Sequence, residues 1–144
     1  MRQVVRICKA RGWRLAIAGM EWERIEEFAP HAIGHCVSGE MAAHLSRRSK
    51  INLHCNGEVL YHNRLLEVFA AGAFCWSWCP GDSDCEGLGA PQFCMANLEA
   101  SLERWMANDS KRNEETERIG EIVRRVHTFD NLVKKLMKGD DDAH

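Results

Sequence analysis

The stretch that decides the fold reads INLHCN at residues 51–56, NRLLEVFAAG at residues 63–72 and AFCWSW at residues 73–78. Short continuous apolar runs such as the first and the third are typical of strands that are buried on both faces. The middle segment reads as a compact helix that ends at Gly72, with Phe69 on its buried side. We therefore expect a strand, a helix and a second strand that lies parallel to the first.

Polar residues stand at the start of this expected helix. Asn63 and Arg64 open it, and Glu67 follows one turn after Asn63, so these side chains can face a common ligand. The preceding strand ends at Cys55-Asn56, directly before the loop that leads into the helix. Because the first turn of a helix offers free N–H groups and the positive end of the helix dipole, we expect an anionic ligand here.

The rest of the chain continues the alternation of strands and helices. We expect further strands at residues 13–18, 32–37 and 92–95. We expect further helices over residues 1–11, over residues 21–28, after Ser38, after Asn97, after Asp109 and after Thr128. This order indicates an α/β fold, a Rossmann-like parallel sheet with helices on both faces. Ligands of such sheets bind outside the carboxyl ends of the strands, which are expected at Gly19, Val37-Ser38, Cys55-Asn56 and Trp78-Cys79.

Length and composition point to one globular domain. The chain has 144 residues, and we expect a single domain over residues 1–138 and a frayed acidic tail over residues 139–144. The formal net charge is −2 and the Lys and Arg residues are spread out, so nucleic acid and anionic membranes are not expected partners. No apolar run approaches the length of a membrane span, and basic residues interrupt the N-terminal segment, so we expect a cytoplasmic protein.

The seven cysteines are expected to be thiols in a reducing compartment, buried as small apolar residues. Cys75, Cys79, Cys85 and Cys94 are separated by three, five and eight residues. These spacings do not match the paired C-x-x-C knuckles of zinc sites, and no metal site is predicted. Cys79 and Cys85 flank Gly81 and leave open one alternative, a metal-binding or redox-active pair across that loop.

Taken in order, these motifs resemble a known family. The strand Ile51 to His54 and the helical segment RLLEVFAAGAF at residues 64–74 resemble the strand–loop–helix core of GT-B glycosyltransferases. The likeness is closest to the CgeB-like, spore-maturation group, in which an Asn-bearing strand precedes an Arg-x-x-Glu helix that ends in a small residue and Gly. Residues 15–19 with Trp22, Gly34 before residues 38–40, and residues 112–137 fit its other elements. The likeness covers nearly the whole chain and corresponds to the C-terminal, donor-binding half of such an enzyme, without its usual first strand.

The resemblance implies roles for individual residues. Glu67 stands where the family has an acidic residue that accepts a hydrogen bond from the nucleotide ribose. Asn63, Arg64 and the neighbouring backbone N–H groups match the diphosphate side, and Gly19 lines the floor near the donor. Cys36 and Val37 fall where the base edge would pack. The residues expected to bind the nucleotide sugar are Gly19, Cys36, Val37, Asn56, Asn63, Arg64 and Glu67.

The same resemblance implies the reaction and the partners. Such enzymes transfer a sugar from a nucleotide diphosphate to an acceptor, generally without a bound metal, because the helix end and basic side chains stabilise the leaving diphosphate. Their active site is a cleft between two domains, so a separate N-terminal acceptor domain or chain is an expected partner. The alternative is a non-catalytic nucleotide-binding module, from a split or degenerate enzyme.

Each of these residues also has a purely structural interpretation. Glu67 can be a solvated helix residue, and Arg64 can pair with Glu67 or Glu58 on the surface with little effect on stability. Asn63 can be a helix cap. Three histidines near strand ends are more often packed or hydrogen-bonded than catalytic, and these are His35, His54 and His62.

Overall fold

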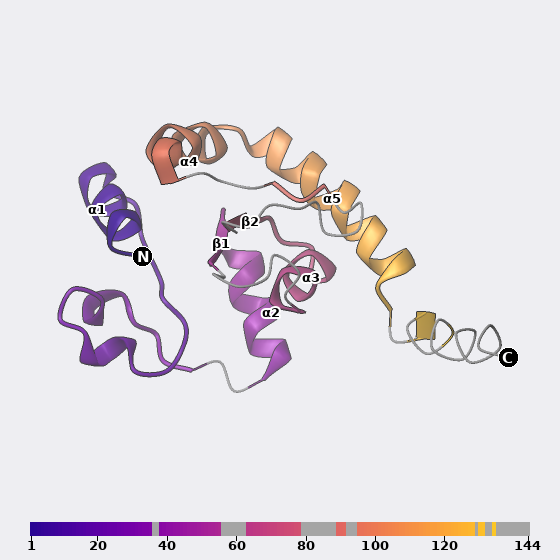
Figure 1. Cartoon of the computed structure of the whole chain (residues 1–144), viewed down its shortest axis with the longest axis horizontal. Coiled ribbons are helices and arrows are strands. Elements are labelled where there is room, and N and C mark those ends of the chain that lie inside the picture. Colours follow the sequence, from indigo (N-terminus) through magenta and orange to yellow (C-terminus); the bar gives the residue numbers. More distant parts are fainter. Residues whose placement is uncertain are drawn as a thin grey trace, which may run out of the picture. The chain divides into compact units, whose positions relative to one another are not determined.

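The computed structural model describes residues 1–35, 38–55, 63–78, 89–91, 95–128, 130, 131 and 134. The chain divides into two compact units, Met1–Ala42 and Ala43–His144, whose elements are labelled in Figure 1. Across the described ranges there are five α-helices and one parallel sheet of two strands. The α/β fold is therefore confirmed, whereas the single domain over residues 1–138 stays a prediction.

The first unit opens with the expected helix, α1 (Arg2–Arg11). Gly12 follows it in the left-handed conformation at φ 65°, and its N–H donates to the last turn, so the expected glycine stop is confirmed. The expected strands over residues 13–18 and 32–37 form one parallel bridge, between Ile17 and Ala32. Two 3₁₀ turns, Trp22–Arg24 and Ala29–His31, replace the expected helix over residues 21–28.

Apolar packing in this unit is limited. Val5, Ile17 and Phe28 form its buried cluster, against which Leu15 and Trp22 pack. The rings of Trp22 and Phe28 meet edge to face with centroids 5.4 Å apart. This small cluster holds α1 and the two 3₁₀ turns together.

The second unit contains the sheet and the longer helices. After α2 (Gly39–Arg48), whose start lies in the first unit, the elements are β1 (Asn52–Cys55), α3 (Asn63–Ala70), β2 (Cys75–Trp78), α4 (Leu98–Ala107) and α5 (Asp109–Val126). The strands β1 and β2 are parallel, in a register that pairs Asn52 with Cys75 and Cys55 with Trp78. The expected strand–helix–strand unit is therefore present. The expected strand at residues 92–95 falls mostly outside the described residues, and Met95 begins a 3₁₀ turn.

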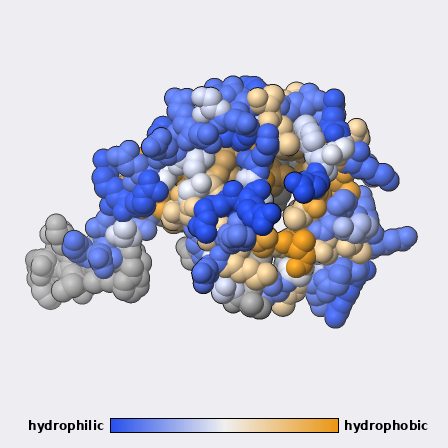
Figure 2. All heavy atoms as spheres, turned by 180° about the vertical axis from the view of Figure 1, so that it is seen from behind, coloured by the Kyte–Doolittle hydropathy of each residue, from blue (hydrophilic) through white to orange (hydrophobic). Residues whose placement is uncertain are grey.

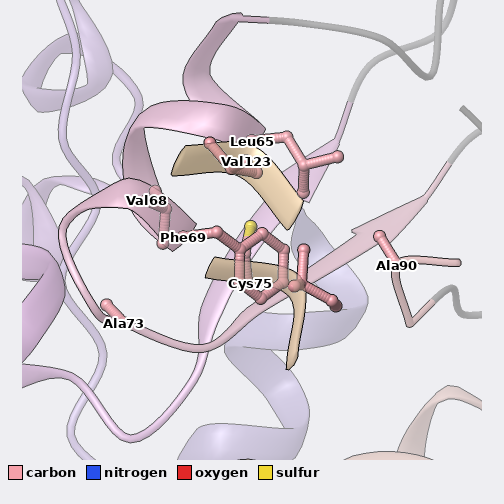
Figure 3. Close-up of a cluster of buried hydrophobic side chains, with 8 residues drawn as sticks. Leu65, Val68, Phe69, Ala73, Cys75, Ala90 and Val123 are labelled. Atoms are coloured by element: carbon pink, nitrogen blue, oxygen red, sulfur yellow. The ribbon is translucent and has the colours of Figure 1, made fainter. Parts of the chain in front are cut away.

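Helices cover both faces of β2. On one face, Leu65 and Phe69 of α3 meet Cys75 and the α5 residues Ile119 and Val123 in one buried cluster. Figure 3 shows labelled side chains from these three elements converging on Phe69 and Cys75. On the other face, Phe74 packs against Trp105 of α4 with ring centroids 4.8 Å apart. Because neighbouring residues of an extended segment point to opposite faces, the helices enclose β2 from both sides.

Gly120 sets the distance between α5 and α3. A Cβ at this position would lie 3.1 Å from the carbonyl oxygen of Phe69. Ile119 and Val123 flank Gly120 on the buried side of α5 and are almost completely buried. The missing side chain therefore allows the two helices to approach closely at the centre of the cluster.

A buried arginine joins α4 to α5. The side-chain oxygen of Asn108 accepts from the N–H of Lys111 at 2.9 Å and caps α5. Arg112, one turn into α5, is only 5% exposed. Its guanidinium donates to the carbonyl oxygen of Trp105, at the end of α4, and to the carboxylate of Asp109. The turn between the helices is thus held by side-chain hydrogen bonds at both of its ends.

The surface is largely polar. Figure 2 shows hydrophilic residues over most of the face seen there, with apolar patches between them. Of the helices that the structure describes, none is long and apolar enough to cross a membrane.

Candidate functional site

The carboxyl ends of the two strands and the start of α3 define one corner of the sheet. Since β1 and β2 are parallel, their last residues, Cys55 and Trp78, lie at the same edge. The helix α3 follows β1 and precedes β2 in the chain, so it runs from the end of one strand back to the start of the next. It therefore begins at that edge, with Asn63 as its first residue. This is the position that the sequence predicted for an anionic ligand.

The exposed side of α3 carries a charged pair. A guanidinium nitrogen of Arg64 lies 2.9 Å from a carboxylate oxygen of Glu67, and the two side chains are 50% and 56% exposed. Leu65, Val68 and Phe69 face the core. The helix therefore presents a cation and an anion to solvent together, within its first two turns. An exposed pair of this kind contributes little to stability, and both groups remain accessible to a ligand.

Two polar residues under the same edge form part of this corner. His54 on β1 and Ser77 on β2 are neighbours in the strand register, one residue before the strands end. Ser77 points to the same face as Cys75, toward α3, and is completely buried. Among the described residues its hydroxyl has no hydrogen-bond partner, which is unusual for a buried polar atom.

The sequence analysis weighed a packed against a catalytic role for His54 and did not single out Ser77. The available signal was a lone serine between two tryptophans in a run that is otherwise apolar, residues 73–78. Burying a polar side chain costs free energy unless it is hydrogen-bonded. A polar residue near the carboxyl edge of a parallel sheet can interact with a ligand, because ligands of such sheets bind at that edge.

A third segment lies beside the end of β2. The N–H of Ser77 donates to the carbonyl oxygen of Pro91 at 3.0 Å. Arg118 of α5 donates to the carbonyl oxygen of Gly89 at 2.7 Å, and Ala90 belongs to the buried cluster. Residues 89–91 are therefore fixed against this edge of the sheet.

The other expected site residues belong to the first unit or lie outside the described residues. Gly19 belongs to the first unit, at φ 139°, where a Cβ would lie 2.5 Å from the indole nitrogen of Trp22. In that unit its glycine identity is explained by close packing against this ring. Cys36, Val37 and Asn56 lie outside the described residues. The structure thus brings Asn63, Arg64 and Glu67 together on α3.

The cysteine alternative concerns residues outside the described ranges, where Cys79, Cys85 and Cys94 all lie, and it stays a prediction. Cys8 and Cys75 are buried and form no disulfide, and burial raises the pKa of the Cys8 thiol above its ordinary value. Among the residues with a described position, no group of three His, Cys, Asp or Glu side chains could hold a metal ion.

Polar groups at the carboxyl edge of parallel strands are typical of α/β domains that bind small molecules. The family follows from comparison with known proteins, in which the model of the glycosyl transferase-like family matches residues 2–138. Because the match covers almost the entire chain, the chain belongs to this glycosyl transferase-like family. No curated protein and no solved structure matches the chain significantly.

Proposed function

We propose that this chain is the donor-binding domain of a GT-B glycosyltransferase of the CgeB-like type, which transfers a sugar from a nucleoside diphosphate to an acceptor. Membership of the glycosyl transferase-like family supports the reaction class. The observation that carries the assignment of the site is the Arg64–Glu67 pair at the start of α3, at the carboxyl edge of the sheet. In this proposal Arg64 binds the diphosphate of the nucleotide, and Glu67 binds its ribose.

The two side chains have different roles in this proposal. The N–H groups at the start of α3 and the guanidinium of Arg64 are donors for diphosphate oxygens. The carboxylate of Glu67 is an acceptor for ribose hydroxyls, and a guanidinium nitrogen of Arg64 lies 2.9 Å from it. As the glycosidic bond breaks, negative charge grows on the leaving diphosphate, and the same donors stabilise it. This arrangement works without a bound metal.

The remaining parts of the proposal concern the partner and the compartment. A sugar transferred at this edge needs an acceptor site opposite it, and we assign that site to an N-terminal domain, on the same or a separate chain. Cys8 and Cys75 form no disulfide, as expected in a reducing compartment, and we place the reaction in the cytoplasm.

Thermal unfolding in the presence of nucleotides tests the assignment. A ligand that binds only the folded chain stabilises it by about 2.7 kcal/mol at about 100 times its dissociation constant. We expect one of UDP, GDP and ADP to raise the Tm of the wild type and to have a much smaller effect on Glu67→Gln. The matched control is Glu121→Gln, which removes an exposed carboxylate from α5 and should respond like the wild type. Equal responses of both variants would contradict the role of Glu67.

A further inference from the structure

A hollow lies at the edge of the sheet opposite the α3 corner, where the strands begin. Lys50 stands just before β1, and Ala73 and Phe74 stand just before β2. Together with the end of α2 and one side of α5, these residues line an open pocket of about 600 Å³. The strands are four residues long, so this pocket lies about 13 Å from the α3 corner.

Positive charge dominates the lining. Five cationic and two acidic side chains contribute, and the cations are Arg47, Arg48, Lys50, Arg112 and Arg124. Asp109 forms ion pairs with two of these cations. Its carboxylate accepts a hydrogen bond from Arg112 and lies 3.4 Å from the ammonium nitrogen of Lys50. The hydrogen bond from Arg112 and the charge of Lys50 hold the pKa of Asp109 below its usual value.

Three arginines of the lining have no such partner. Within the part of the chain that the structure describes, the guanidinium groups of Arg47, Arg48 and Arg124 make no hydrogen bond and no ion pair. They stand in the last turns of α2 and α5, where the negative end of each helix dipole offsets some of their charge.

We propose that this pocket binds a small polyanion with two or more phosphate groups, through Arg47, Arg48 and Arg124. The planar fork of a guanidinium matches two phosphate oxygens at once, and three forks suit a linear oligophosphate. The volume of about 600 Å³ suits a small molecule, because ligand pockets typically measure about 300–1,000 Å³. Asn113 and Thr116 of α5 add neutral hydrogen-bonding groups beside the cations. This site is independent of the donor site on α3.

Calorimetric titration of the full chain with inorganic tripolyphosphate tests the proposal. We expect the wild type to bind and Arg124→Gln to bind at least about tenfold more weakly, because it loses a charge-assisted, bidentate contact. Arg125→Gln is the matched control, since Arg125 is exposed on the same turn of α5 and does not line the pocket. The Arg125→Gln variant loses the same charge as Arg124→Gln, and its affinity for tripolyphosphate should stay within about twofold of the wild type.

A double variant separates this pocket from the α3 corner. Arg47→Gln with Arg48→Gln should weaken tripolyphosphate binding as Arg124→Gln does, and should leave the nucleotide-induced rise in Tm unchanged. Unchanged unfolding curves of all variants show that they are folded. Three results would overturn the proposal: no binding by the folded wild type, equal losses in Arg124→Gln and Arg125→Gln, or unchanged binding by the variant with both Arg47→Gln and Arg48→Gln. None of these results bears on nucleotide binding by the α3 corner, which the Tm measurement decides.

Discussion

Two segments of the chain were both expected to be strands, and they differ in what covers them. In β2, Cys75, Trp76 and Ser77 are at most 1% exposed, because α3 and α5 lie on one face and α4 on the other. In residues 13–18, Ile17 alone is buried, and every second residue is exposed. β2 forms a continuous parallel ladder, whereas residues 13–18 form a single bridge. Parallel pairing thus persists where both faces are covered.

The same difference appears in the two units as wholes. All large apolar side chains recorded as exposed in the described ranges belong to the first unit, and they are Met1, Met20, Ile25, Ile33 and Met41. This unit has only about 40 residues, too few to bury most of its own surface. We expect substitutions in its cluster to cost less than equivalent substitutions in the cluster around Phe69.

The largest effect is expected from Phe69→Ala. Phe69 is completely buried between α3, β2 and α5, and its truncation leaves a cavity that costs about 3–5 kcal/mol in the free energy of unfolding. Phe28→Ala is the matched substitution in the first unit, where the smaller cluster can collapse around the gap. Urea denaturation of both variants compares the two clusters. A larger loss in Phe28→Ala would reverse the comparison.

A smaller effect is expected from Gly120→Val. The new side chain meets the carbonyl oxygen of Phe69 and pushes α5 from α3, with a cost of about 1–3 kcal/mol for overpacking. Glu121→Val places the same residue at the next position of the helix, which is exposed, and costs only the difference in helix propensity, about 0.5 kcal/mol. The same denaturation assay measures both. Equal losses would show that α5 does not rely on close approach at Gly120.

The smallest effect concerns the ion pairs and depends on pH. The pKa of Asp109 is lowered in the folded chain, so its contribution is complete above the ordinary value of 3.8 and is lost as the pH falls through the folded value. Asp109→Asn should therefore be less stable than the wild type at pH 6 and approach it at pH 3. Glu27→Gln, which removes the exposed partner of Arg2, should change stability by less than about 0.5 kcal/mol at either pH. A pH-independent difference for Asp109→Asn would contradict the stated linkage.

Periodic apolar patterns and glycine stops predicted the elements that the fold requires. Local sequence predicted the helices α1 and α3, their ends at Gly12 and Gly72, and the parallel pair β1 and β2. The hydroxyl of Ser38 accepts from the N–H of Met41 and caps α2 as expected. These features depend on neighbouring residues, which the sequence displays directly.

Features set by tertiary contacts were not predictable in this way. Arg112 stands among many charged residues of α5, and its burial depends on the carbonyl oxygen of Trp105 in another helix. Ser77 differs from its apolar neighbours, but its position beside His54 needs the strand register. For the site, sequence placed Arg64 and Glu67 on one exposed face of α3, and their roles toward a nucleotide remain a proposal.

The central claim is that the α3 corner binds a nucleoside diphosphate, and calorimetric titration of the chain with UDP, GDP and ADP tests it most directly. The titrations are run with and without EDTA, on the wild type and on Glu67→Ala. The account predicts that one of the three nucleotides binds the wild type with the same affinity in both conditions. In Glu67→Ala its affinity should fall by about tenfold or more, as expected for a lost charge-assisted hydrogen bond. Binding of none of them by the folded wild type, or equal binding by Glu67→Ala, would contradict the claim.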